Sequence, residues 1–162
     1  METYNNMKSD VSSSVTPVDR EKAVSQFNSL LQGEISAVET YRIAVDKMRT
    51  FANLVDLQKC LASHETRVSK LRTRVSSIGG KAAEGSGAWG AFAKLVEGGA
   101  AVFGDNTAIK ALEEGEDKGL KDYRDTSKLD PAVAQFVQYD LLPAQIETHA
   151  SMSALKRSIA ND

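Results

Sequence analysis

A ten-residue frame that occurs twice constrains this chain more than any other feature. Residues 33–42 read G-E-x-x-x-V-x-x-Y-R, and residues 115–124 repeat the frame, with leucine for valine, 82 positions later. The same offset relates Glu65 to Glu147, so each half carries one glutamate in the frame and another 31 residues downstream. A duplication of this kind predicts two similar helical hairpins that pack against each other around a shared polar site.

Apolar residues recur at steps of three and four along most of the chain, which is the period of an amphipathic helix. Gly79-Gly80 is typical of a helix end, and Asp130-Pro131 is typical of a helix start. Pro143 lies inside the last apolar pattern and predicts a kink there. We expect four helices, over residues 16 to about 51, 54–78, 106–127 and 131 to nearly the end.

Residues 81–105 differ in composition from the segments on either side, with many glycines and small residues between a few large apolar ones. We interpret them as a long crossover that contains a short helix around residues 90–97. Such a connection allows the second hairpin to run beside the first. The predicted fold is therefore an all-α, up-down four-helix bundle over residues 16–160, preceded by a disordered polar arm at residues 1–15.

Composition excludes several classes of function. The chain has 162 residues, enough for one domain with a real core, and a net charge of −2, which gives no electrostatic reason to bind nucleic acid or an anionic membrane. The polar N-terminus predicts no secretory signal, so we expect a cytoplasmic protein. The single cysteine, Cys60, is expected to be a small buried hydrophobe. The apolar crossover leaves a homodimer possible.

Carboxylates on apolar helix faces are the informative anomaly. Glu34 and Glu116 both fall on core stripes. An isolated ionised carboxylate costs several kcal/mol to bury, so it needs a cation, a proton or a network of hydrogen bonds. Tyr41 and Tyr123 lie one heptad further along the same stripes and are expected to hydrogen-bond these glutamates.

The two histidines of the chain suggest that a metal ion supplies the positive charge that the buried carboxylates need. His64 precedes Glu65 directly, and His149 follows Glu147 by two residues. Oxygen ligands with some imidazole suit iron or manganese, and a bundle core can hold a metal pair between its helices. The candidate metal ligands are Glu34, Glu65, Glu116, Glu147, His64 and His149.

The sequence resembles a known family over about residues 20–158. The resemblance rests on E-G-E-D-x-x-L-x-x-Y-R at 114–124, its counterpart around Glu34, Gly79-Gly80, and the segment from Leu141-Leu142-Pro143 to Glu147-Thr148-His149. These features are similar to those of bacterial ferritin-like proteins of unknown function, relatives of the rubrerythrins. The resemblance implies a ferritin-like fold and a di-iron-type site with Glu34, Glu65, Glu116 and Glu147 as ligands. Oxygen or peroxide chemistry, in oxidative stress or iron handling, would follow from it.

One departure weakens the catalytic prediction. The usual ferritin-like signature has Glu-x-x-His on the second and fourth helices, whereas Val68 and Ala150 stand three residues after Glu65 and Glu147 here. Two hypotheses therefore remain open. The first is a metal-binding bundle with iron or manganese; the second is a non-catalytic structural or interaction bundle whose glutamates share a metal-free polar core.

Overall fold

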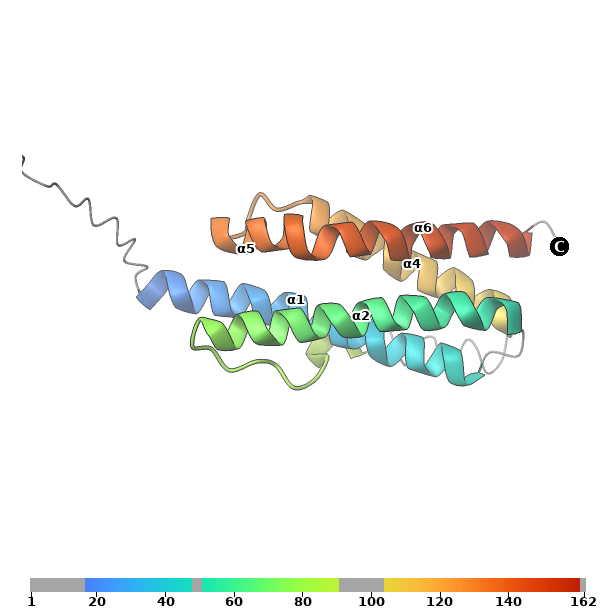
Figure 1. Cartoon of the computed structure of the whole chain (residues 1–162), viewed down its shortest axis with the longest axis horizontal. Coiled ribbons are helices and arrows are strands. Elements are labelled where there is room, and N and C mark those ends of the chain that lie inside the picture. The colour runs from blue at the N-terminus through green and yellow to red at the C-terminus, as the bar shows by residue number, and fades with distance from the viewer. Residues whose placement is uncertain (1–16, 48–50, 91–103, 161–162) are drawn as a thin grey trace, which may run out of the picture.

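The computed structural model describes residues 17–47, 51–90 and 104–160, and these residues form helices and the turns between them. Four long helical segments pack side by side as an all-α four-helix bundle (Figure 1), which confirms the predicted fold class. The helices are α1 (Pro17–Lys47), α2 (Phe51–Ser77), α4 (Asp105–Arg124), α5 (Pro131–Phe136) and α6 (Leu142–Ala160), with a short 3₁₀ turn, η1 (Gly87–Trp89), and a π-helical turn, η2 (Val137–Leu141).

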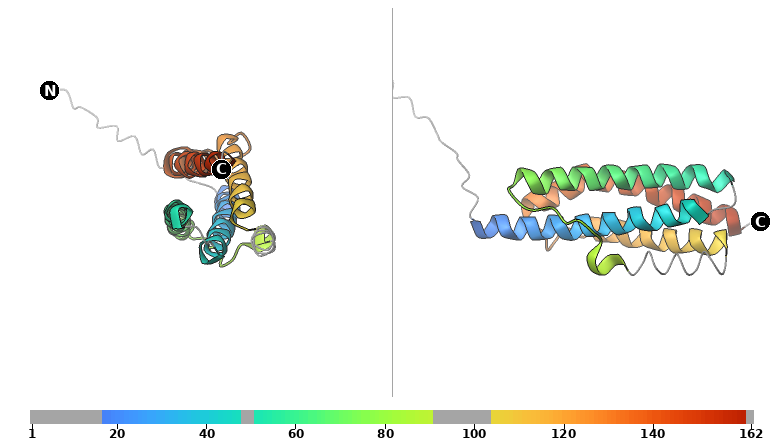
Figure 2. Two further views of the ribbon diagram at one scale, coloured as in Figure 1. Left: turned by 90° about the vertical axis from the view of Figure 1, so that its right-hand side faces the viewer. Right: turned by 90° about the horizontal axis from the view of Figure 1, so that it is seen from below.

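The bundle consists of two hairpins. The helices α1 and α2 pack along each other, as do α4 and α6. The hairpins meet through α2 against α6 and, less extensively, through α1 against α4; Figure 2 shows this arrangement along the bundle axis. The predicted N-terminal arm and most of the predicted short helix at 90–97 lie outside the described residues.

The helix α2 ends just before Gly79-Gly80 and α5 begins at Pro131, as the sequence predicts. Gly79 has a φ of +75° after the end of α2, and its N–H and that of Gly80 donate to the carbonyls of Ser76 and Val75 at 3.0 and 2.9 Å. This left-handed turn favours glycine because it carries no Cβ. At the start of α5, the carboxylate of Asp130 accepts a hydrogen bond from the N–H of Ala132 at 2.9 Å, and Pro131 occupies the first turn.

The irregularity that Pro143 predicts takes the form of a π-helical turn. Residues Val137–Leu141 form this turn directly before α6. A π turn holds about one more residue than an α turn. Residues after it are therefore shifted by about one position relative to an uninterrupted helix.

A polar layer divides the core into two apolar clusters. On α2, His64 separates Leu57 and Cys60, which belong to one cluster, from Val68 and Leu71, which belong to the other. Burial raises the pKa of the Cys60 thiol to about 12, so this cysteine is a buried, protonated thiol. None of the helices in the described ranges has the length and apolar character needed to cross a membrane.

Candidate polar site

Two carboxylates and one imidazole meet in the polar layer. Glu34 of α1, His64 of α2 and Glu116 of α4 are 4%, 4% and 2% exposed. The Nδ1 atom of His64 lies 2.8 Å from Oε2 of Glu34, and its Nε2 atom lies 2.9 Å from Oε1 of Glu116. The imidazole ring therefore bridges the two glutamates of the repeated frame.

The two tyrosines of the repeated frame hydrogen-bond the glutamates of the opposite halves. The hydroxyl of Tyr41 donates to Oε1 of Glu116 at 2.6 Å, and the hydroxyl of Tyr123 donates to Oε1 of Glu34. Each tyrosine thus links α1 to α4. Burial and the neighbouring carboxylate raise the pKa of both phenols well above the ordinary value, so both hydroxyls stay protonated and act as donors.

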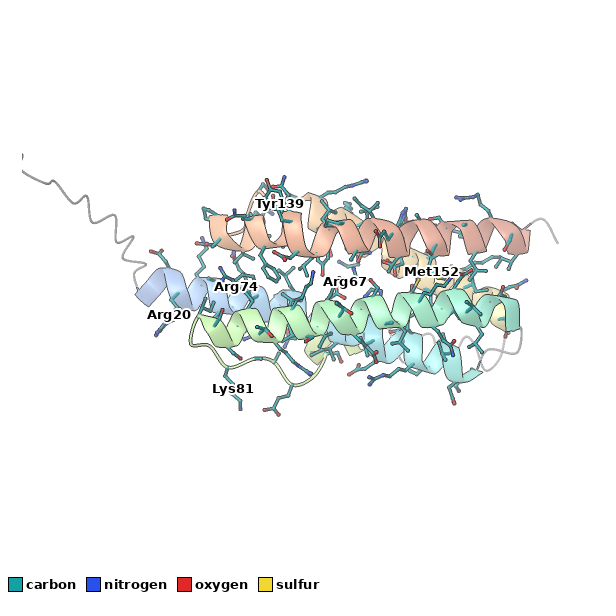
Figure 3. All side chains as sticks on the ribbon, in the orientation of Figure 1. Arg20, Arg67, Arg74, Lys81, Tyr139 and Met152 are labelled. Atoms are coloured by element: carbon teal, nitrogen blue, oxygen red, sulfur yellow. The ribbon has the colours of Figure 1, made fainter. Side chains whose placement is uncertain are left out.

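Arg67 brings a second cation into the layer, which was not predicted from the sequence. Its side chain is 1% exposed and extends from α2 toward α6 (Figure 3). Its Nε atom lies 3.4 Å from Oε2 of Glu34, and its Nη1 atom donates to Oε1 of Gln145. Its Nη2 atom lies 3.4 Å from the Thr148 hydroxyl oxygen.

Gln145 and Thr148 on α6 complete the environment of Glu116. The amide nitrogen of Gln145 and the hydroxyl of Thr148 donate to Oε2 of Glu116 at 2.7 and 2.8 Å. Together with Tyr41 and His64 on Oε1, four protein groups contact this one carboxylate. No carboxylate oxygen of Glu34 or Glu116 lacks a protein partner.

The duplicated halves contribute equivalent positions, but with a different offset on the second helices. His64 and Arg67 on α2 are three residues apart, as are Gln145 and Thr148 on α6, so each pair lies on one helix face. These pairs are related by an offset of 81, whereas Glu34 and Glu116 are related by 82. The i, i+3 spacing was a signal that could have identified Arg67, Gln145 and Thr148.

The electrostatics of the layer favour charged glutamates and a protonated histidine. Burial opposes ionisation of Glu34, but the charges of His64 and Arg67 outweigh it and lower the pKa of this carboxyl. For Glu116, burial is outweighed by the hydrogen bond and charge of His64, and its pKa is also lowered. Burial by itself would lower the pKa of His64, but Glu34 and the hydrogen bonds to both glutamates raise it.

One close contact works against this charge state. Nη2 of Arg67 lies 2.8 Å from Nδ1 of His64, so a protonated imidazole faces a guanidinium nitrogen. Arg67 accordingly acts to lower the pKa of His64. The carboxylates are the stronger influence, because one lies within hydrogen-bonding distance of each ring nitrogen and the net effect raises the pKa of His64. We therefore assign two carboxylates, one imidazolium and one guanidinium, which sum to zero charge.

The other predicted ligands lie elsewhere, so the expectation that four glutamates meet in the interior was wrong. Glu65 is exposed and forms a 2.7 Å ion pair with Arg42, and Glu147 is exposed. His149 is partly buried, and its Nε2 atom lies 2.7 Å from Oδ1 of Asp117. The physical reason is helical rotation. Adjacent residues point about 100° apart, and the inward positions are held by His64 and by Thr148 instead.

The polar layer does not fit the dinuclear metal site that the resemblance implies. Two of the four carboxylates are outside it, and the inner two already have protein donors on every oxygen. A metal ion would also stand close to the buried guanidinium of Arg67, which repels it. His64 and Arg67 supply the positive charge that a metal would otherwise bring.

A cavity of about 530 Å³ lies between α1 and α4 and reaches this layer. Glu34, Tyr41 and Glu116 contribute to its floor, and small residues such as Gly33 and Ala37 form part of its wall. A Cβ atom placed on Gly33 would meet no atom of the described residues within 4 Å, which agrees with open space at this point. The weaker packing of α1 against α4 thus leaves room beside the network.

Two glycine substitutions, which we expect to change the free energy of unfolding in opposite directions, test this packing. Gly33→Ala should stabilise the fold by about 1 kcal/mol, because alanine favours the helix interior and the space is open. Gly119→Ala should instead destabilise it by about 1–2 kcal/mol, because its Cβ would lie 2.8 Å from Nε2 of Gln145, which Glu116 and Arg67 hold in place. Urea unfolding of both variants measures the difference; equal shifts would contradict the described packing.

Comparison with known proteins gives one result. A search of curated proteins and a search of solved structures each returned no match. A family model described as "Domain of unknown function (DUF2383)" matches residues 22–129. That range contains Glu34, His64, Arg67 and Glu116, and it ends before Gln145 and Thr148. Because the match covers more than half of the sequence, the chain belongs to the family described as a domain of unknown function, DUF2383.

Proposed function

We propose that this chain is a non-catalytic, ferritin-like structural or interaction bundle with a metal-free polar core. The observation that carries the proposal is the buried Arg67 beside Glu34, together with the imidazole of His64 between Glu34 and Glu116. These cations neutralise the two carboxylates within the protein. Because the layer draws on α1, α2, α4 and α6, its role is to hold the two hairpins in one register.

Polar groups in a core can specify one packing arrangement over others. Here Tyr41 and His64 each reach Glu116 from the first hairpin, and Tyr123 reaches Glu34 from the second. A shift of one hairpin by a helical turn would separate these partners and leave charges buried without compensation. The network therefore penalises alternative registers that the two apolar clusters alone would tolerate.

The alternative is an iron or manganese site on Glu34, His64 and Glu116, with oxygen or peroxide chemistry in oxidative stress or iron handling. The observation in its favour is that Glu34, His64 and Glu116 do converge, beside a cavity that gives access to them. It would require that a metal displace the proton of His64 and reorganise Arg67.

Elemental analysis of protein purified without chelator separates the two proposals. The metal-free core predicts far less than one iron or manganese ion per chain, and the same low content in Glu116→Gln. The alternative predicts iron or manganese bound in a stoichiometric amount, lost in Glu116→Gln but retained in Glu147→Gln. That second pattern would overturn the metal-free core.

A further inference from the structure

Three side chains of types that ligate metals come together between α4 and α6, and none of them is among the groups that form the polar layer. Glu113 and Asp117 are one turn apart on α4, and His149 faces them from α6. One ligand atom from each side chain lies within 4.8 Å of the other two. We propose that Glu113, Asp117 and His149 form a binding site for one zinc ion.

The types of donor support zinc rather than magnesium or calcium. One imidazole nitrogen and two carboxylate oxygens form a mixed set that transition metals prefer, whereas calcium and magnesium are bound mainly by oxygen atoms. Three protein ligands with water in the fourth position are a common tetrahedral arrangement for zinc. Two ligands come from one helix turn and the third from the neighbouring helix, so binding would also join α4 to α6.

The surroundings give the site partial order and open access. Glu113 is 7% exposed, and its carboxylate accepts from Lys156 at 2.5 Å and from the Ser153 hydroxyl at 3.3 Å. Asp117 and His149 line a surface depression of about 630 Å³, which leaves room for water ligands. His149 is oriented by the 2.7 Å contact of its Nε2 atom with Oδ1 of Asp117.

Lys156 provides a specific test of the zinc site, because its ammonium group competes with a metal ion for the carboxylate of Glu113. Lys121 and Arg124 line the same depression and also disfavour a cation by charge alone. Binding must therefore come from direct coordination by the imidazole and the carboxylates. Removing Lys156 should strengthen binding, whereas a purely structural role for these residues predicts no such gain.

Isothermal titration of the full chain with zinc chloride, after chelator treatment and near neutral pH, tests the site. We expect one zinc ion per chain, with binding weakened at least about tenfold in His149→Ala and in Asp117→Asn. Lys156→Met should bind more tightly. Glu147→Gln is the matched control, because it removes an exposed carboxylate from the same helix that is not among the three ligands.

Two results would overturn the site: no zinc binding by the wild-type chain, or equal binding by His149→Ala and Asp117→Asn. Circular dichroism checks that the variants are folded, and Asp117→Asn is an exposed, isosteric change that preserves packing. This site is independent of the metal-free core. Glu116→Gln should leave zinc binding unchanged, so failure of one proposal does not imply failure of the other.

Discussion

Replacing Arg67 with methionine is expected to destabilise the fold by about 3–5 kcal/mol, the usual cost of removing one partner from a buried ion pair. Methionine preserves much of the side-chain volume but leaves Glu34 with less positive charge beside it. It also leaves Oε1 of Gln145 without its guanidinium donor. The free energy of unfolding from urea titration, compared between variant and wild type, measures the effect.

A double variant shows whether charge is the cause. In Arg67→Met/Glu34→Gln the carboxylate that Arg67 neutralises is gone as well, so the loss should be smaller than the sum of the single losses. Arg42→Met is the control, because Arg42 and Glu65 are 63% and 45% exposed and such pairs contribute about 1 kcal/mol or less. A loss in Arg67→Met no larger than in Arg42→Met would contradict the assigned role.

Glu116→Gln is expected to cost about 3 kcal/mol although the two side chains have nearly the same shape. All four groups around Glu116 act as donors: Tyr41 and His64 on one oxygen, Gln145 and Thr148 on the other. A glutamine amide must turn its NH₂ group toward one of these pairs. The hydroxyls can rotate, but His64 and Gln145 cannot, since Glu34 and Arg67 fix them from the other side. Hydrogen bonds to a charged group contribute about 1.5–3 kcal/mol each, which sets the magnitude.

The matched control is Glu147→Gln, the same chemical change at an exposed position. It should alter the free energy of unfolding by no more than about 0.5 kcal/mol. If the two variants unfolded at the same denaturant concentration, Glu116 would not be the acceptor at the centre of the network. A rise in stability for Glu116→Gln would have the same meaning.

The sequence was sufficient to predict the bundle because its signals are local and consistent. Apolar periodicity, Gly79-Gly80 and Asp130-Pro131 each act within a few residues, and the repeated frame adds a pairing of halves. Glu34 and Glu116 were predicted inside for a sound reason: both replace apolar residues on a core stripe. Both glutamates are in the interior, 4% and 2% exposed.

The site residues on the second helix of each hairpin were predicted wrongly, because a shift of one residue moves a side chain to a different face of the helix. Extending the offset of 82 from the first helices selected Glu65 and Glu147, whereas the inward positions follow an offset of 81. The second half is one residue shorter at this point, because Gln145 stands 29 positions after Glu116 whereas His64 stands 30 positions after Glu34. Periodicity also does not reveal whether a proline gives a kink or a π turn. Arg67 was overlooked because it stands close to Lys70, Arg72 and Arg74, and a cluster of basic residues on a helix usually forms a solvated face.

The most direct test of the central claim is the protonation state of His64, followed by nitrogen NMR of the imidazole across a pH titration. If the core neutralises its own carboxylates, His64 should be doubly protonated at neutral pH, with a pKa above its ordinary value of 6.5. The titration should move down in Glu116→Gln, which removes one of its two acceptors. A neutral imidazole at pH 7, or a ring nitrogen bound to metal in the purified protein, would contradict the account.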